Sequence, residues 1–405
     1  MSVDENKCSR REFLKTAGAA GVGSALMALA GPPGIFAAEN PDRSTVPQRP
    51  FGRSGMNVSI LSLGGMFDTG SNQLLLKQAV KWGVTYWDTA DCYGWSGSEK
   101  GIGKYFKRYP EDRQKIFLVT KSDDRDPEGL SRLLDRSLER MNTDYVDLYF
   151  VHGISGIDEL GGRTRAWAEK AKADGKIRLF GFSTHSNMEE CLHDAAKLGW
   201  IDGIMMTYNF RLMHSPEMKR AVGACAKAGI GLTAMKTQGG GSVKTSSDAE
   251  LKLAGRFVQN GFTEAQAKLM AVWENRQIAS ICSQMPNLSL LAANTAAALN
   301  RTTLSAVDRK LLQQHAYETA SSYCAGCAKI CETALGGRAP VNDVMRYLMY
   351  SRSYGDREYA AGQFHNISQS LRKNFLALDY SQAEARCPQK VPIGKLMREA
   401  VEEFA

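Results

Sequence analysis

The chain has 405 residues, enough for more than one ordinary domain and for a large buried core. Hydrophobic residues make up 43% of the sequence and charged residues 23%, a balance typical of globular proteins that excludes the disordered, collagenous and multi-span membrane classes. The formal net charge is +8, but the excess of lysine and arginine forms no dense run, so nothing in the sequence supports binding to nucleic acid.

The first forty residues have the character of a targeting segment. Arg10 and Arg11 precede a Phe-Leu-Lys run and an apolar stretch of small residues. This order resembles a twin-arginine export signal, which implies recognition by the twin-arginine export machinery and a periplasmic or other extracytoplasmic location. Because the apolar stretch is shorter than the ~20 residues of a membrane-spanning helix, we expect removal of residues 1–40 and no transmembrane span in the mature chain. An uncleaved signal that tethers the protein is the alternative. That pathway carries folded proteins, so it also predicts a prosthetic group.

From residue 50 to residue 300, short β-rich apolar runs alternate with helical stretches, as expected of repeated βα units. The predicted strands are Val58–Leu63, Val84–Asp88, Ile116–Lys121, Tyr145–His152, Ile177–Ser183, Ile201–Thr207, Ile230–Met235 and Ala279–Cys282. The predicted helices include Gln73–Trp82, Gly129–Met141, Thr164–Asp174, Met188–Leu198 and Pro216–Lys227. Eight parallel strands with outer helices close into a (β/α)8 TIM barrel of ~250 residues, the size of this stretch. An open, doubly wound sheet is the alternative.

Polar side chains fall at the ends of neighbouring predicted strands. Asp88 ends the second strand, Lys121 the third and His152 the fourth. Tyr93 lies in the loop after the second. Strand C-termini in a barrel meet at one mouth, so we expect these side chains to converge. A tyrosine is a poor proton donor at neutral pH unless a cation stabilises its phenolate, and Lys121 would supply that cation and lower the pKa of the phenol. A proton donor with supporting charged and polar groups is what the reduction of a carbonyl group requires.

Longer motifs surround these four residues. They are Asp88-Thr89-Ala90 with Tyr93-Gly94, Thr120-Lys121, Asp147-Leu148-Tyr149 with His152, and Gly181-Phe182-Ser183. Together they resemble the aldo/keto reductase family from residue 51 to about residue 300. The resemblance implies hydride transfer between a nicotinamide and a small-molecule carbonyl or alcohol substrate. It makes Tyr93 the general acid tuned by Lys121. It makes Asp88 the support of Lys121, and His152 the residue that aligns the carbonyl.

The same resemblance implies cofactor-binding residues. Ser183 and Asn209 match positions that bond the nicotinamide carboxamide, although the family's glutamine before Asn209 is replaced by methionine. Thr184 stands where many members have asparagine. Lys236 stands in a glycine-rich stretch that would cradle the pyrophosphate or form only a surface turn. The family contacts adenine with a Glu-Asn pair, of which this sequence keeps only the asparagine, Asn294. The implied cofactor is NAD(P), without a preference between NAD and NADP.

Four of the nine cysteines lie in the last quarter of the chain. Cys324, Cys327 and Cys331 form one run, and Cys387 stands before a proline farther on. Three clustered cysteines and a remote Cys-Pro can supply the four ligands of one [4Fe–4S] cluster. The tail resembles the ferredoxin-like extension of some aldo/keto reductases, although its second interval has three residues instead of two. Structural zinc and disulfides are the alternatives. Cys92 is expected to be a small core residue, with contact to substrate as the alternative.

We therefore expect an exported oxidoreductase. Residues 50–300 would form the barrel, and residues 315–405 a small, mainly helical, cysteine-bearing extension. The alternative is a non-catalytic, electron-transfer or binding protein on a reductase-like barrel. No motif indicates the substrate's identity, the direction of reaction or the oligomeric state.

Overall fold

The computed structural model of the protein describes residues 45–94, 97–240, 256–258, 261–300 and 303–404. The predicted export signal therefore lies outside the described residues. Within the described ranges, no helix is both long and apolar enough to cross a membrane.

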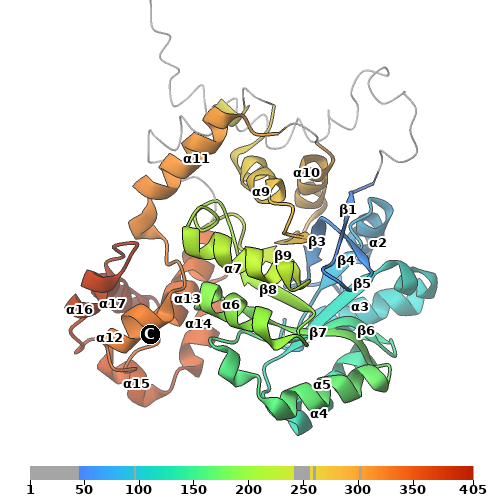
Figure 1. Ribbon diagram of the computed structural model, residues 1–405, viewed down its shortest axis with the longest axis horizontal. Helices are drawn as coiled ribbons and strands as arrows, with labels where there is room; N and C mark the ends of the chain where they lie inside the picture. Colours follow the sequence, from blue (N-terminus) through green and yellow to red (C-terminus); the bar gives the residue numbers. More distant parts are fainter. Residues whose placement is uncertain (1–44, 95–96, 241–255, 259–260, 301–302, 405) are drawn as a thin grey trace, which may run out of the picture.

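Eight parallel strands close into a barrel in the order β10-β3-β4-β5-β6-β7-β8-β9 (Figure 1). They are β3 Leu61–Gly64, β4 Tyr86–Asp88, β5 Phe117–Ser122, β6 Val146–Val151, β7 Ile177–Thr184, β8 Gly203–Thr207, β9 Gly231–Met235 and β10 Ser280–Gln284. Each overlaps one predicted strand, so the predicted (β/α)8 barrel is confirmed. Every pairing between neighbours is parallel, which places all eight strand C-termini at one mouth.

The outer layer consists of the helices that follow the strands. They are α2 Gln73–Lys81, α3 Gly97–Arg108, α4 Pro127–Met141, α5 Gly162–Ala173, α6 Met188–Leu198, α7 Pro216–Lys227, α9 Glu264–Glu274 and α10 Leu288–Leu299, with 3-10 turns at Pro110–Lys115 and Ile157–Glu159. Helices α6 and α7 have the predicted bounds. Helix α4 begins two residues before its predicted start, because Asp126 caps it by accepting from the Gly129 N–H and a proline occupies its first position.

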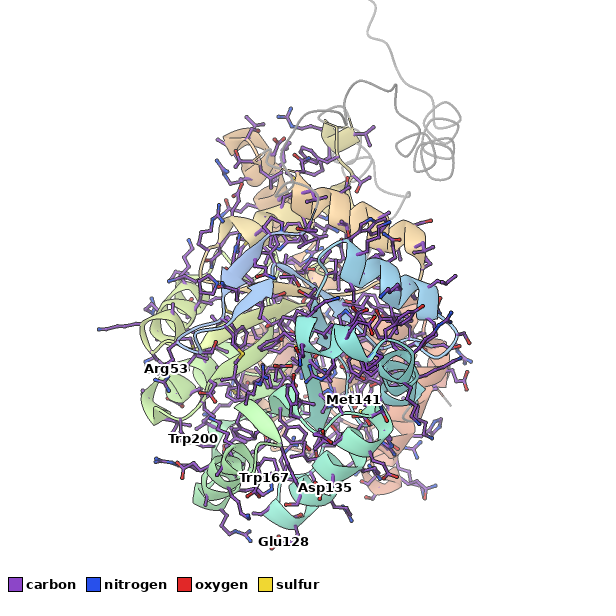
Figure 2. All side chains as sticks on the ribbon, turned by 90° about the vertical axis from the view of Figure 1, so that its right-hand side faces the viewer. Arg53, Glu128, Asp135, Met141, Trp167 and Trp200 are labelled. Atoms are coloured by element: carbon purple, nitrogen blue, oxygen red, sulfur yellow. The ribbon has the colours of Figure 1, made fainter. Side chains whose placement is uncertain are left out.

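Aromatic side chains fill the barrel and its outer face. The antiparallel hairpin of β1 (Gln48–Pro50) and β2 (Asn57–Ser59), which the sequence analysis did not predict, carries Phe51 into the interior. A Cβ atom on Gly231 would lie 2.5 Å from the Phe51 ring, so glycine makes room for this side chain. On the side shown in Figure 2, Trp167 and Trp200 flank Phe180 of β7, with ring centroids 5.8 and 5.6 Å away.

The last hundred residues form the helical extension. Its helices are α11 Ala306–Glu318, α12 Ala328–Ala334, α13 Val341–Tyr354, α14 Arg357–Asn366, α15 Gln369–Asn374, α16 Ser381–Arg386 and α17 Ile393–Phe404, with a 3-10 turn at Ala320–Ser322. They enclose a hydrophobic core of their own, which includes Leu335, Val344, Phe364 and Phe404. Helices α12 to α17 lie beside α6 and α7 at one side of the barrel, in orange and red in Figure 1.

The extension docks on the loop between β7 and α6. The Asn187 N–H donates to the Gly326 carbonyl at 2.7 Å, and the Lys329 N–H donates to the Asn187 side chain at 3.0 Å. Gly326 has a φ of +85°, and a Cβ atom there would lie 2.5 Å from the His185 carbonyl oxygen. Only glycine therefore allows this close approach to the barrel mouth.

Candidate active site

Three of the predicted catalytic side chains meet at the barrel mouth. Lys121, near the end of β5, donates from Nζ to Asp88 Oδ2 at 2.7 Å and to Tyr93 Oη at 3.2 Å. A third bond runs to the Thr89 carbonyl at 2.8 Å. Lys121 is 1% exposed and Asp88 2%. The β4 and β5 strands pair side by side, which explains why residues distant in sequence converge here.

The charge balance at Tyr93 differs from the expectation. Burial raises the pKa of the Tyr93 phenol well above its usual value, and the carboxylate of Asp88 raises it further. The prediction of a net lowering of this pKa is therefore wrong. Because Asp88 neutralises the ammonium at 2.7 Å, the pair presents little net positive charge to the phenol. The phenol stays protonated at neutral pH, which is the form that can donate a proton.

His152 follows β6 and faces Tyr93. The two rings are 5.9 Å apart between centroids and meet edge to face. The Nδ1 atom of His152 lies 2.8 Å from Asp123 Oδ1, and Cys92 Sγ lies 3.8 Å from the same nitrogen. Asp123 was not identified from the sequence; its place directly after the β5 strand end was the available signal. Cys92 is exposed, so its prediction as a core residue is wrong.

The predicted nicotinamide residues lie at the ends of β7 and β8, and all are fully buried. The Ser183 hydroxyl accepts from the Gly153 N–H at 3.0 Å, and the Thr184 hydroxyl donates to the Ser186 carbonyl at 2.7 Å. The Asn209 amide donates to the Lys236 carbonyl at 3.1 Å and to Tyr323 Oη at 2.9 Å. These side chains therefore already form hydrogen bonds with other groups of the protein.

Lys236 follows β9 with a φ of +55°, a left-handed conformation that non-glycine residues seldom adopt. Its Nζ donates to Tyr350 Oη at 3.0 Å and lies 3.2 Å from His185 Nδ1. Burial lowers the pKa of Lys236 well below its usual value, and the positive charge of Arg346 lowers it further. A second lysine therefore lies at the barrel mouth, in surroundings that disfavour its charged form. Asn294 lies instead on α10, where its amide donates to Ser283 Oγ at 3.0 Å.

Helix α13 of the extension contributes residues that sequence reasoning missed. Tyr350 bonds Lys236, and Arg346, one turn earlier, pairs with Asp343 at 2.8 Å. Tyr359 of α14 packs its ring 5.6 Å from the Tyr350 ring. The only signal for these residues was the abundance of tyrosine and arginine between the two groups of cysteines.

The four C-terminal cysteines line one small cavity between α12, α13 and the start of α17. All four are free thiols. Among the described residues, a single set of three potential ligands (Cys92, Asp123 and His152) comes within 4.8 Å of one another, so no three of the four sulfur atoms are that close. Tetrahedral zinc would hold four sulfur atoms ~3.8 Å apart, given Zn–S bonds of ~2.3 Å. A cluster with one iron for each thiolate accommodates a wider spacing.

Comparison with known proteins agrees with this geometry. The family model described as "Aldo/keto reductase family" matches residues 61–327. The chain belongs to the aldo/keto reductase family.

The relatives whose names state an activity share between a quarter and about a third of their aligned residues with this chain. An NADP(+) aldo-keto reductase of Schizosaccharomyces pombe is 34% identical over 154 residues, which cover 34% of this chain and 43% of that protein. The L-galactose dehydrogenase of Arabidopsis thaliana is 25% identical and covers 62% of this chain and 87% of its own. The chain spans only 43% to 66% of the first four curated relatives that it matches.

Solved structures share the barrel. The holo form of an aldo-keto reductase from Bacillus halodurans superposes with a TM-score of 0.57 at 24% identity, covering 66% of this chain and 96% of that one. A thermostable aldo-keto reductase solved with the inhibitor epalrestat gives 0.56 at 26% identity, covering 66% and 99%. About a third of this chain therefore lies outside the fold shared with these structures. The family match ends at residue 327, within the extension.

Proposed function

We propose that this protein is an NAD(P)-dependent oxidoreductase that interconverts a small-molecule carbonyl and the corresponding alcohol. The observation that carries the proposal is the convergence of Asp88, Lys121 and Tyr93 by hydrogen bonds of 2.7 and 3.2 Å, with His152 facing Tyr93. Membership of the family supports the same reaction class.

The chain's own residues account for the proton in this reaction. The phenol of Tyr93 gives its proton to the carbonyl oxygen as the oxygen gains negative charge, and Lys121 Nζ, 3.2 Å away, stabilises the resulting phenolate. Asp88 holds the ammonium in place through its 2.7 Å ion pair. His152 lies where it can orient the same oxygen. In the reverse direction, Tyr93 takes up the proton of an alcohol.

A bound nicotinamide would supply or accept the hydride, and the described residues offer it a partial fit. Ser183 keeps its hydroxyl proton for a carboxamide oxygen, because the bond from the Gly153 N–H uses only an acceptor position. To bind the carboxamide, Asn209 would have to give up its hydrogen bond to Tyr323. Lys236 stands beside these residues, and a phosphate group bound there would favour the charged form of its amine. Asn294 would lie at the adenine end of the cofactor.

The substitution Tyr93→Phe tests this function. It removes the donated proton and keeps the ring, so carbonyl reduction should fall by about 10²–10⁴-fold while circular dichroism and the melting temperature stay unchanged. If the variant keeps full activity, or if the wild type reduces no carbonyl in a broad substrate panel with NADH and NADPH, the protein is better explained as a non-catalytic or electron-transfer protein on this barrel.

We also propose that Cys324, Cys327, Cys331 and Cys387 hold one [4Fe–4S] cluster. Their shared cavity supports a common metal centre, and the lack of any three of these sulfur atoms within 4.8 Å of one another favours a cluster over a single zinc ion. None of the four forms a disulfide in the structure. Anaerobically purified protein should contain four iron and four sulfide per chain and a broad absorption near ~400 nm that dithionite bleaches. One zinc per chain and no iron would contradict this proposal.

The resemblance of residues 1–40 to a twin-arginine signal supports the further proposal of export in the folded state. Diffusible dinucleotide is scarce outside the cytoplasm, so we propose that NAD(P) travels bound and is recycled on a second substrate. Protein purified from the periplasm and then denatured should release one dinucleotide per chain. Exported protein that releases no dinucleotide would contradict the proposal that NAD(P) travels bound.

A further inference from the structure

Three unlike side chains with metal-binding atoms meet beside the reaction site. Cys92 comes from the loop after β4, Asp123 follows β5, and His152 follows β6. The Cys92 Sγ and His152 Nδ1 atoms are 3.8 Å apart, and His152 Nδ1 is 2.8 Å from Asp123 Oδ1. All three ligand atoms lie within 4.8 Å of one another, which no other such trio does in the part of the chain that the structure describes.

These distances are close to those of a zinc site. With Zn–S of ~2.3 Å and Zn–N and Zn–O of ~2.1 Å, tetrahedral angles separate sulfur from nitrogen by ~3.6 Å and nitrogen from oxygen by ~3.4 Å. These two pairs therefore differ from the ideal spacing by only about 0.2 and 0.6 Å, and the sulfur and the carboxylate oxygen lie within 4.8 Å of each other. The donor types, thiolate, imidazole and carboxylate, are those that zinc prefers.

The surroundings favour a cation and let it enter. The Asp123 side chain is 61% exposed and that of His152 is 14% exposed, so the ligand atoms can be reached from solvent. The neighbouring Asp91 carries a buried carboxylate oxygen, Oδ1, that has no hydrogen-bond partner. Its other oxygen pairs with Arg136 at 3.1 Å. An unpaired buried acceptor adds negative potential next to Cys92.

We propose that Cys92, Asp123 and His152 form a binding site for a divalent zinc ion at the edge of the barrel mouth. Three protein ligands leave the fourth tetrahedral position open to water, which is the pattern of exchangeable and catalytic zinc sites. The charges balance, because one thiolate and one carboxylate neutralise the ion. Binding releases one proton, that of the Cys92 thiol.

Zinc would also change the tautomer of His152. Without metal, Nδ1 faces the Asp123 carboxylate and must carry the proton of a neutral imidazole, so Nε2 can only accept a hydrogen bond. A metal on Nδ1 moves that proton to Nε2, which then becomes a donor. This step rests on the proposed function: the oxygen that gains negative charge needs a hydrogen-bond donor. Both directions pass through the same transition state, so zinc at this site would raise kcat/KM for carbonyl reduction and for alcohol oxidation alike.

Equilibrium dialysis of the full, cluster-loaded chain against Zn²⁺ tests the site. The wild type should bind one more zinc ion per chain than Cys92→Ser, and Asp123→Asn should bind that ion at least about tenfold more weakly. Cys225→Ala, which removes a buried thiol on α7, is the matched control and should bind as the wild type does. Any zinc held by the C-terminal cysteines is common to all variants and cancels in the comparison.

A spectroscopic measurement and a kinetic one complete the test. With Co²⁺ as the probe, the wild type minus Cys92→Ser difference spectrum should show a thiolate-to-cobalt charge-transfer band. Added zinc should raise kcat/KM for carbonyl reduction and for alcohol oxidation by the same factor in the wild type and change neither in Cys92→Ser. Equal zinc content of these two proteins would overturn the site. Zinc binding without a change in kcat/KM would overturn the link to His152, and the zinc-content measurement does not depend on the proposed function or on the Tyr93→Phe test.

Discussion

The barrel and the extension are specified in different ways. In the barrel, eight strands and the helices between them repeat one pattern, and a single large core joins strands to outer helices. The extension has short helices, several of only six or seven residues, around a smaller core next to the cysteine cavity. Short helices are marginal without tertiary support. The comparison indicates that the repeated pattern of the barrel suffices to specify it, whereas the short helices of the extension have a smaller core and would gain most from the proposed cluster.

The largest effect is expected from Lys121→Met in the barrel. It removes the ammonium beside Tyr93, so kcat/KM for carbonyl reduction should fall by about 10²–10⁴-fold. It also leaves Asp88 buried without its partner, which should cost about 3–5 kcal/mol of unfolding free energy. Steady-state kinetics and urea unfolding measure the two effects. The double variant Lys121→Met with Asp88→Asn should regain stability but not activity; recovery of activity would contradict the role of the ammonium.

Loss of a proposed cluster ligand should lower the stability of the extension without lowering that of the barrel. Cys387→Ser should purify without iron, and calorimetry should show a weakened transition for the extension while the barrel transition keeps its melting temperature. The physical reason is that ligand binding adds its free energy only to the region that folds around it. Cys191→Ser, which alters a buried thiol on α6, is the control for iron content. One cooperative transition that shifts as a whole would show that the regions do not differ in this way.

A pH effect is expected where α11 meets the barrel. His315 stacks on Phe210, with centroids 6.0 Å apart, and burial, then the charges of Arg211 and Lys268, lower the pKa of His315 to about 4. The folded state therefore binds fewer protons than the unfolded chain between pH 6.5 and 4. Stability is complete above pH 6.5 and is lost as the pH falls toward 4, by about 2 kcal/mol from pH 7 to pH 5.

Urea unfolding at the two pH values measures this contribution. His315→Gln cannot take up the proton, so its stability should change less between pH 7 and pH 5 than that of the wild type. An equal change in both proteins would assign the pH dependence to other groups.

The smallest effect is expected at the contact between the regions. Tyr350→Phe removes the 3.0 Å hydrogen bond to Lys236 and keeps the ring. Because this bond helps to fix Lys236, we expect a three- to tenfold loss in kcat/KM, equivalent to about 1 kcal/mol, and little change in stability. Tyr354→Phe, on the same helix, is the control. If Tyr350→Phe retains full activity, the extension covers the mouth without taking part in its chemistry.

The sequence was sufficient for elements with a strong local signal. Helices α6 and α7 have the predicted bounds, because an apolar face, a glycine after α6 and a Ser-Pro start at α7 mark their ends. Helix α3 was not predicted, since it contains glycines. A Cβ atom on Gly101 or Gly103 would come within about 2 Å of the Thr69 hydroxyl or the Arg140 carbonyl, so close packing requires these poor helix formers.

The same contrast applies to the site. Asp88, Lys121, Tyr93 and His152 could be predicted because strand ends share one mouth. Tyr350 and Tyr323 could not, because nothing local in the sequence says how the extension folds back over the barrel. The sign of the pKa shift at Tyr93 was also missed, since it depends on burial and on a 2.7 Å ion pair that spacing alone does not give.

The hydrogen bond from Asn209 to Tyr323 connects the barrel mouth with the cysteine run. Tyr323 directly precedes Cys324, so the loop that would grip the inorganic centre also fixes an amide at the end of β8. On the proposed function, a nicotinamide that takes up this amide would release Tyr323. Occupancy of the barrel mouth and the position of the cysteine run would then be coupled through this one side chain.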